Sequence, residues 1–163
     1  MNVEPVSIGE KLLLWDMLQT YIEELSVYAD VQRVNGVYEY KWFDAYWTDE
    51  QRWPFWAKED GSRAGFALIL RDVDANAMRV GEFYIRPEFR RSRMGEAFAL
   101  ALLARFPGPW KIRQMAANRP AVAFWRRTLA RYDYTEANFV DRDLERFEQT
   151  LIVPSVNSSS STT

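Results

Sequence analysis

The chain has 163 residues, of which 48% are hydrophobic, and a formal net charge of -2 at pH 7. This length is typical of one domain with a hydrophobic core, which we place at residues 1–153. Residues 154–163 are rich in Ser and Thr, and we predict a disordered tail there. The slightly acidic charge argues against nucleic-acid and membrane partners, because such proteins need a basic surface.

Two residue types are missing from the sequence, and this restricts its chemistry. Without Cys and His, the chain has no disulfide, thiol nucleophile, imidazole metal site or Ser-His-Asp triad. Glu, Asp, Tyr, Lys or water must therefore carry any proton transfer. No apolar run is long enough to span a membrane, and the N-terminal segment does not resemble a secretory signal. We expect a cytoplasmic location.

The first half of the chain is predicted to form two helices and an antiparallel meander. Ser7 and Glu10 fit a capping box, and apolar residues then recur at helical spacing over residues 8–29. A shorter helix is expected at residues 44–51. Apolar and alternating runs predict three strands joined by short turns, at residues 53–58, 64–70 and 79–85.

The second half is predicted to form two helices and three strands. Met94, Phe98 and Leu102 lie on one stripe of the first of these helices. Asn118 can cap the second, whose buried stripe contains Val122, Trp125, Leu129 and Tyr132. The strands are expected at residues 110–115, 134–140 and 146–153. Because a helix separates them, the strands at 79–85 and 110–115 can run parallel.

Four arginines precede the helix that carries Met94: Arg86, Arg90, Arg91 and Arg93. A helix N-terminus has unpaired N–H groups and a partial positive charge, so it favours an anion. A bound polyanion would relieve the repulsion among these arginines, with Ser92 adding a hydroxyl and Gly95 allowing close approach. The alternative is a solvated loop in which Gly95 only allows the helix to pack closely on the sheet. The known glycine-rich phosphate loops are absent from the sequence.

The stretch RPEFRRSRMGEAFA, residues 86–99, resembles motif A of the GNAT N-acetyltransferases, with residues 90–95 at the pattern [RQ]-x-x-G-x-[GA]. The preceding strand GEFYI also matches, and NRPAVAFWRR resembles the family's N-x-x-A-x-x-F-Y helix. The resemblance covers residues 7–153 and is strongest to predicted acetyltransferases of unassigned substrate. It implies an α/β fold whose mostly antiparallel sheet contains a splayed parallel strand pair and is flanked by helices.

This resemblance implies acetyl-CoA as the cosubstrate, no metal, and direct attack by a primary amine on the acetyl group. The pyrophosphate would lie on the amides of residues 91–96, and the pantetheine would lie between the strands that end at Ile85 and begin at Trp110. Asn118 would face the distal pantetheine, or serve only as the helix cap. The residues implied in cofactor binding are Phe83, Tyr84, Ile85, Arg90, Arg91, Ser92, Arg93, Met94, Gly95, Glu96, Asn118 and Trp125.

The sequence departs from the family pattern at two positions. Arg93 stands where the motif has its first Gly, so its side chain could narrow the pyrophosphate cradle or bind a phosphate oxygen. Trp125 stands where a Tyr often protonates the leaving thiolate, and an indole N–H supplies no proton at neutral pH. The proton must then come from Tyr132, Tyr84 or water.

Glu82 is the candidate general base, because it lies in a mostly apolar strand beside the expected position of the acetyl group. Partial burial would raise its pKa toward neutrality. The alternative is a structural ion pair with a basic residue across the sheet, such as Arg79 or Arg113.

The acceptor is predicted only as an amine of a small molecule or peptide. Residues 38–56 are rich in aromatic side chains, which could form a packed core and lid or the wall of a substrate cleft. The same segment contains four carboxylates, which could bind a cationic amine or could simply form a solvated face: Glu39, Asp44, Asp49 and Glu50. Alternative functions are a non-catalytic acyl-CoA-binding module and a protein-interaction module, and a homodimer is left open.

Overall fold

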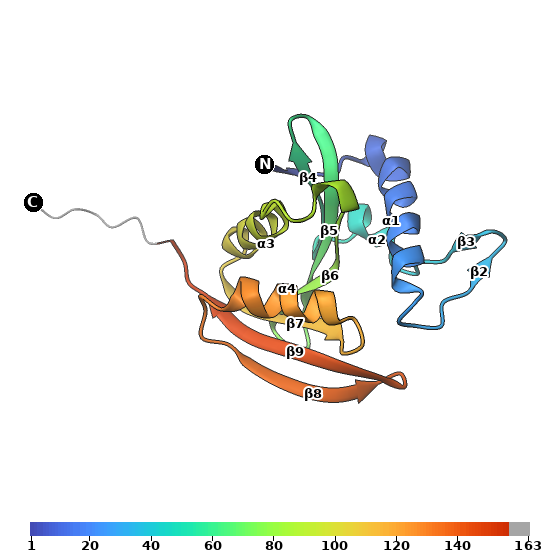
Figure 1. Ribbon diagram of the computed structural model, residues 1–163. Coiled ribbons are helices and arrows are strands. Elements are labelled where there is room, and N and C mark those ends of the chain that lie inside the picture. Colours follow the sequence, from blue (N-terminus) through green and yellow to red (C-terminus); the bar gives the residue numbers. More distant parts are fainter. Residues whose placement is uncertain (157–163) are drawn as a thin grey trace, which may run out of the picture.

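Seven strands form one sheet in the order β1-β4-β5-β6-β7-β9-β8 in the computed structural model, which describes residues 1–156 (Figure 1). The tail predicted at residues 154–163 therefore lies mostly outside the described residues. The strands are β1 (Asn2–Pro5), β4 (Arg52–Glu59), β5 (Ser62–Asp72), β6 (Ala77–Ile85), β7 (Gly108–Met115), β8 (Thr135–Asp141) and β9 (Leu144–Val153).

The helices cover both faces of this sheet. They are α1 (Lys11–Leu25), α2 (Ala45–Thr48), α3 (Met94–Arg105) and α4 (Arg119–Leu129), with short 3-10 turns at Ile8–Glu10 and Pro87–Phe89. Figure 1 shows α3 and α4 on one side of the sheet and α1 on the other. Each face has its own buried cluster, with Phe98, Trp110 and Leu129 on the α3–α4 side and Leu14, Trp56 and Phe66 on the α1 side.

All neighbouring strands of the sheet are antiparallel except β6 and β7. The predicted meander of β4, β5 and β6 is confirmed, and so is the parallel strand pair joined through α3. The parallel ladder contains only two residue pairs, Met78 with Trp110 and Arg79 with Lys111. Beyond them, residues 80–85 of β6 and 112–115 of β7 are unpaired with each other, so the two strands diverge.

A β-bulge lies in β6 close to the point where the strands diverge. Leu68 pairs with Glu82 and Ile69 pairs with Val80, so Gly81 has no partner on β5. A Cβ at Gly81 would come within 2.9 Å of the Tyr46 hydroxyl and 3.1 Å of the Leu68 carbonyl oxygen. Such bulges bend a strand and redirect its side chains, and this one determines which way Glu82 points.

Several boundaries differ from the sequence prediction. The capping box of Ser7 and Glu10 is confirmed, but the helix ends at Leu25, where a turn satisfies the last carbonyl groups. The second helix is shorter than predicted and ends at Thr48. The prediction missed β1, and it missed a hairpin of β2 (Arg33–Val34) and β3 (Val37–Tyr38) in the loop after α1. Strands of two to four residues carry too little pattern to be predicted.

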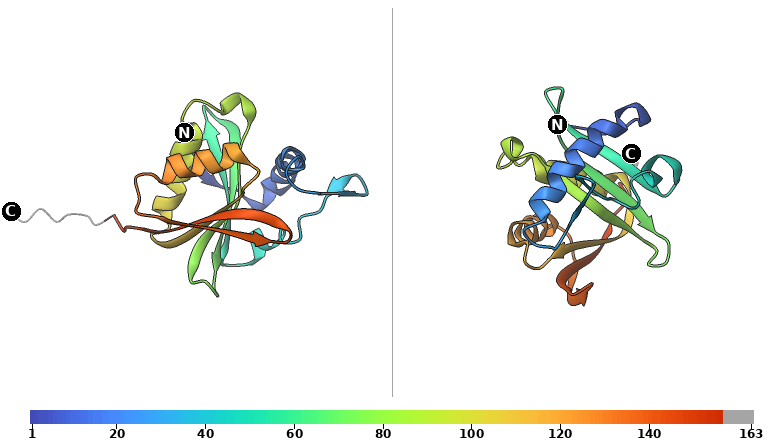
Figure 2. Two further views of the ribbon diagram at one scale, coloured as in Figure 1. Left: turned by 60° about the horizontal axis from the view of Figure 1, so that its bottom comes forward. Right: turned by 90° about the vertical axis from the view of Figure 1, so that its right-hand side faces the viewer.

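Helix α4 has the predicted cap and most of its predicted buried stripe. Val122, Trp125 and Leu129 are buried, whereas Tyr132 lies beyond the end of the helix and is half-buried. Figure 2 shows the hairpin of β8 and β9 at the edge of the sheet opposite β1. None of the helices in residues 1–156 is long and apolar enough to cross a membrane.

Gly65 provides a test of the β5–β6 register. It pairs with Ile85, and a Cβ there would come within 2.1 Å of the Tyr84 carbonyl oxygen. We expect Gly65→Ala to lower the free energy of unfolding by about 2–3 kcal/mol, because overpacking shifts the backbone. Gly9→Ala is the control, since its Cβ would meet only Ser7 Oγ at 3.9 Å. Equal urea stability of the two variants would contradict this register.

Candidate active site

The divergence of β6 and β7 leaves one edge of each strand without a strand partner. On β6 this edge comprises residues 80–85, which include three predicted cofactor-binding residues: Phe83, Tyr84 and Ile85. The Phe83 ring packs on the α3–α4 side, with its centroid 5.3 Å from that of Phe98 and 5.1 Å from that of Trp125. The free backbone groups of this edge can therefore bind an extended ligand that contains amides.

The N-terminus of α3 presents a row of free backbone amides a short loop after β6. Within residues 1–156, the amides of residues 91–96 donate to no protein acceptor, and the first helical bond runs from Ala97 N to Arg93 O at 3.0 Å. Arg91 and Arg93 have positive φ angles of 71° and 59°. This backbone region costs a non-glycine residue about 1–2 kcal/mol. Six free N–H groups at the positive end of a helix favour an anion.

The side chains of this segment differ in what they contact. Those of Arg91 and Arg93 are exposed, while Met94 is buried in the core. The Ser92 hydroxyl donates to the Phe89 carbonyl oxygen at 2.9 Å. Glu96 accepts a hydrogen bond from Arg131 Nη2 at 3.0 Å. The two exposed arginines can therefore reach an anion bound at the amides.

Arg90 connects the loop to two other elements. Its guanidinium forms a bidentate pair with Glu24 of α1, at 3.0 and 2.8 Å, and its Nε donates to the Ile85 carbonyl oxygen at 2.8 Å. The loop before α3 is therefore fixed both to α1 and to the end of β6. This role was not predicted, because Glu24 lies 66 residues away in the sequence.

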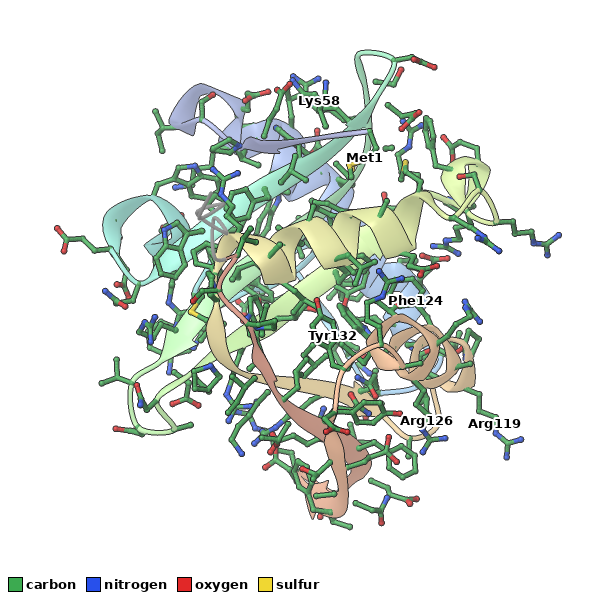
Figure 3. All side chains as sticks on the ribbon, turned by 90° about the vertical axis from the view of Figure 1, so that its left-hand side faces the viewer. Met1, Lys58, Arg119, Phe124, Arg126 and Tyr132 are labelled. Atoms are coloured by element: carbon green, nitrogen blue, oxygen red, sulfur yellow. The ribbon has the colours of Figure 1, made fainter. Side chains whose placement is uncertain are left out.

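Gly95 allows close packing of α3. A Cβ there would lie 3.3 Å from the Phe124 ring and 3.4 Å from Ile85 Cγ1. Figure 3 labels Phe124, which lies between α3 and α4. The structure thus supports the packing interpretation of Gly95, and this packing also holds the free amides beside the end of β6.

Asn118 and Trp125 both have structural roles at α4. The Asn118 side chain caps the helix by accepting a hydrogen bond from Ala121 N at 3.3 Å. Trp125 is buried in the aromatic cluster with Phe83 and Phe124. Its indole therefore fills the space between the helix and β6.

Glu82 is half-buried on the opposite face of the sheet, toward α1. Its carboxylate accepts hydrogen bonds from Tyr21 Oη at 2.6 Å and from Tyr40 Oη at 3.2 Å. Burial raises the pKa of Glu82 from 4.5 to about 7, although the two tyrosines and the charge of Arg146 favour the ionised form. The carboxylate is thus poised to gain or lose a proton near neutral pH.

The two arginines named as ion-pair partners for Glu82 do not bind it, and of the basic residues that the structure describes, only the charge of Arg146 acts on its carboxylate. Arg79 binds Asp72 and Glu148, and Arg113 binds Glu148, so both arginines have other partners.

The two tyrosines that bind Glu82 were missed by the sequence analysis. They come from α1 and from the loop after β3, 61 and 42 residues away from Glu82. Burial and the neighbouring Glu82 carboxylate raise the pKa of Tyr21 and that of Tyr40. Both phenols therefore stay protonated and donate to the carboxylate.

The two tyrosines considered as acids lie on different faces. Tyr84 is buried on the Glu82 face, with its ring centroid 5.5 Å from that of Tyr21, and burial raises its pKa. Tyr132 packs against the core on the α3–α4 face (Figure 3). The structure therefore brings Tyr84 to the side of Glu82 and leaves Tyr132 on the other side.

The comparisons with known proteins agree with this architecture. The model of the Acetyltransferase (GNAT) family matches residues 14–130, which is more than half of the chain. No curated protein is significantly similar to the chain in sequence. The structure resembles the ribosomal-protein-S18-alanine N-acetyltransferase from Escherichia coli, with a TM-score of 0.63, 14% identity, and 97% of each chain covered.

Two further similar structures contain coenzyme A. The spermidine N-acetyltransferase from Vibrio cholerae in complex with CoA and spermine has a TM-score of 0.64 and 11% identity, covering 93% of this chain and 95% of that one. The PaiA N-acetyltransferase from Thermoplasma acidophilum in complex with coenzyme A has a TM-score of 0.62 and 11% identity, covering 90% and 96%. The chain belongs to the GNAT acetyltransferase family, and it is an acetyl-CoA-dependent N-acetyltransferase.

Glu82 should make stability depend on pH in a defined direction. Because its folded-state pKa is raised from 4.5 to about 7, its stabilising contribution is complete below pH 4.5 and is lost as the pH rises toward 7. Glu82→Gln removes this titration. Its free energy of unfolding relative to the unmodified protein should rise by on the order of 2 kcal/mol from pH 5 to pH 8.

The control for this measurement is Glu10→Gln. The hydrogen bond from Arg63 lowers the pKa of Glu10 to about 2, so its contribution is lost only as the pH falls below 4.5. Its difference from the unmodified protein should therefore stay constant between pH 5 and pH 8. A constant difference for Glu82→Gln as well would show that the pKa of Glu82 is not raised.

Proposed function

We propose that the free amides of residues 91–96 bind the pyrophosphate of acetyl-CoA and that the gap between β6 and β7 receives its pantetheine. The observation that carries this proposal is the position of the six amides, which follow after a short loop the strand that diverges from its parallel partner. A ligand with an anionic group joined to an extended chain of amides fits both features. Exposed Arg91 and Arg93 add positive charge beside the anion.

We assign Glu82 as the general base. When bound, acetyl-CoA supplies the acetyl group as a thioester. Glu82 accepts a proton from the ammonium group of the acceptor, so that the amine nitrogen can form the new amide bond as the carbon–sulfur bond breaks. A base with a pKa of about 7 is partly ionised at neutral pH, and Tyr21 and Tyr40 hold its carboxylate in place.

We propose Tyr132 as the acid that protonates the leaving thiolate. It lies on the α3–α4 face, which is the side from which the pantetheine would enter. Buried Trp125 cannot supply the proton, and Tyr84 packs on the Glu82 face. Water is the alternative donor, in which case Tyr132→Phe would leave the rate unchanged.

The alternative that the sequence left open, a non-catalytic acyl-CoA-binding module, conflicts with the family assignment. Trp125 and Arg93 favour it, because both replace residues that the family pattern uses for turnover or for the phosphate turn. If acetyl-CoA binds but no amine causes release of the free CoA thiol, this alternative is established. Three points stay predictions from the sequence: a cytoplasmic location, the absence of nucleic-acid and membrane partners, and the possible formation of a homodimer.

Glu82→Gln tests the assigned base. We expect kcat/KM for the acceptor to fall by about 10²–10⁴-fold, with an unchanged Kd for acetyl-CoA. In the unmodified enzyme kcat/KM should rise with pH through about 7, and the variant should lose this rise. Glu39→Gln is the control, because this exposed carboxylate is adjacent to Tyr40. An unchanged rate and pH profile in Glu82→Gln would exclude Glu82 as the base.

Arg93→Gly tests the departure from the family motif. Within residues 1–156 Arg93 forms no ion pair, so its guanidinium is available to a phosphate oxygen. We expect Arg93→Gly to raise the Kd of acetyl-CoA by about 10-fold in isothermal titration, because a charge-assisted hydrogen bond is lost. Tighter binding would show instead that the side chain narrows the cradle.

Arg142→Gly is the matched control for this titration. Arg142 is also exposed and also has a positive φ, 52°, but it lies in the turn between β8 and β9. The two substitutions therefore make the same chemical change in a similar backbone conformation. Arg142→Gly should leave the Kd of acetyl-CoA unchanged.

A further inference from the structure

A group of charged residues covers the α1-side face of β6, β7 and β9, beside Glu82. The Glu148 carboxylate accepts hydrogen bonds from three basic side chains: Arg79 Nη1 at 3.1 Å, Lys111 Nζ at 3.3 Å, and Arg113 Nε. Arg79 also pairs with Asp72 at 2.6 Å. The charges of these three cations are thus compensated by two carboxylates, those of buried Glu148 and of Asp72.

Arg146 adds a fourth cation on the same face. In the strand register Arg146 of β9 lies opposite Met115 of β7, two residues along each strand from the pair of Glu148 and Arg113. Side chains two residues apart on a strand point to the same face, so Arg146 and Glu148 share a face. Its nearest carboxylate is Asp141 Oδ2, 3.7 Å from Nε, which is beyond hydrogen-bond distance. Its Nε is buried without a hydrogen-bond partner among residues 1–156, although 21% of the side chain is exposed.

Arg146 is close to the base, and the strand that carries it also borders a groove. Its positive charge lowers the pKa of Glu82, which opposes the effect of burial. Its register partner Met115 and its neighbours Glu145 and Phe147 line a groove of about 590 Å³, together with Tyr28 after α1. Arg146 itself is not among the residues that line the groove, because successive side chains of β9 point to opposite faces and its guanidinium lies on the face of Glu82.

Two of the four acidic residues that favoured a cationic acceptor in the sequence are neutralised in the structure. Asp44 pairs with Lys11 at 2.6 Å, and Asp49 pairs with Arg52 at 3.5 Å. On the face of Glu82, Arg146 is the cation that lacks a hydrogen-bonded carboxylate among the described residues. A polycationic amine would be repelled there, whereas an anionic group would be attracted.

We propose that the acceptor is a small amine that carries a carboxylate close to its amino group, as free amino acids do, and that Arg146 binds this carboxylate. Lys111 and Arg113 extend the positive surface around it. A guanidinium suits this role because its planar donors match a carboxylate in a bidentate pair. This inference rests on the proposed function, since the amino group must reach Glu82.

The first test compares acceptors in the unmodified enzyme and needs no variant. Free amino acids, their carboxamides and spermidine are assayed with acetyl-CoA by release of the free thiol. We expect kcat/KM to be about 10- to 100-fold higher for an amino acid than for its carboxamide, because a charge-assisted pair is lost. Spermidine should be the poorest acceptor.

The second test uses Arg146→Gln, with Arg142→Gln as the matched control from the turn of the same hairpin. Arg146→Gln should raise KM for the amino acid by about 10-fold and leave KM for the carboxamide and for acetyl-CoA unchanged. Isothermal titration of the amino acid into the enzyme with CoA should show the same loss of affinity. Arg142→Gln should change none of these values.

The outcomes separate this inference from the proposed function. If no acceptor releases thiol although acetyl-CoA binds, the proposed enzyme function fails, and the inference fails with it. If carboxamides or spermidine react as well as amino acids, the enzyme function stands and the carboxylate site is wrong. An equal KM increase for the acid and the amide in Arg146→Gln would also overturn the site, because it would indicate a general structural effect.

Discussion

The parallel pairing of β6 and β7 stops after two residue pairs, and the rest of the active site depends on this early end. A complete ladder would leave no free strand edge for a ligand. The divergence exposes residues 80–85 of β6 just before the chain enters the loop that carries six free amides. Gly95 and the bidentate pair of Arg90 and Glu24 keep that loop close to the strand. One interruption of the sheet thus places an unpaired strand edge and six free amides in the same region of the fold.

The same strand presents different chemistry on its two faces. On the α3–α4 side, Phe83 packs into an aromatic cluster with Phe98 and Trp125. On the α1 side, the bulge at Gly81 directs Glu82 to two protonated tyrosines and to a positively charged surface. A raised pKa is therefore a consequence of where the strand lies, since burial outweighs the hydrogen bonds and the charge of Arg146. In the proposed function, the sheet separates the side that binds the cofactor from the side that receives the acceptor.

The parts of this account that depend on local pattern could be predicted from the sequence. The meander, the strand–helix–strand unit, the cap at Asn118 and the raised pKa of Glu82 all follow from neighbouring residues. The partners of Glu82 could not be predicted, because Tyr21 and Tyr40 reach it only through the packing of α1 and of its following loop. The ion pairs of Asp44 with Lys11 and of Asp49 with Arg52, which neutralise two of the four carboxylates in residues 38–56, could not be predicted either. Short strands were missed for a different reason, since β1 and the β2–β3 hairpin contain too few residues to show a period.

The most direct test of the central claim is a titration of the ¹⁵N-labelled protein with acetyl-CoA, followed by amide chemical shifts. The account predicts that the largest changes fall on the amides of residues 91–96 and on residues 80–85 of β6, with smaller changes along 112–118. Perturbations confined to other surfaces, or the absence of any change at saturating acetyl-CoA, would contradict the assignment of this site.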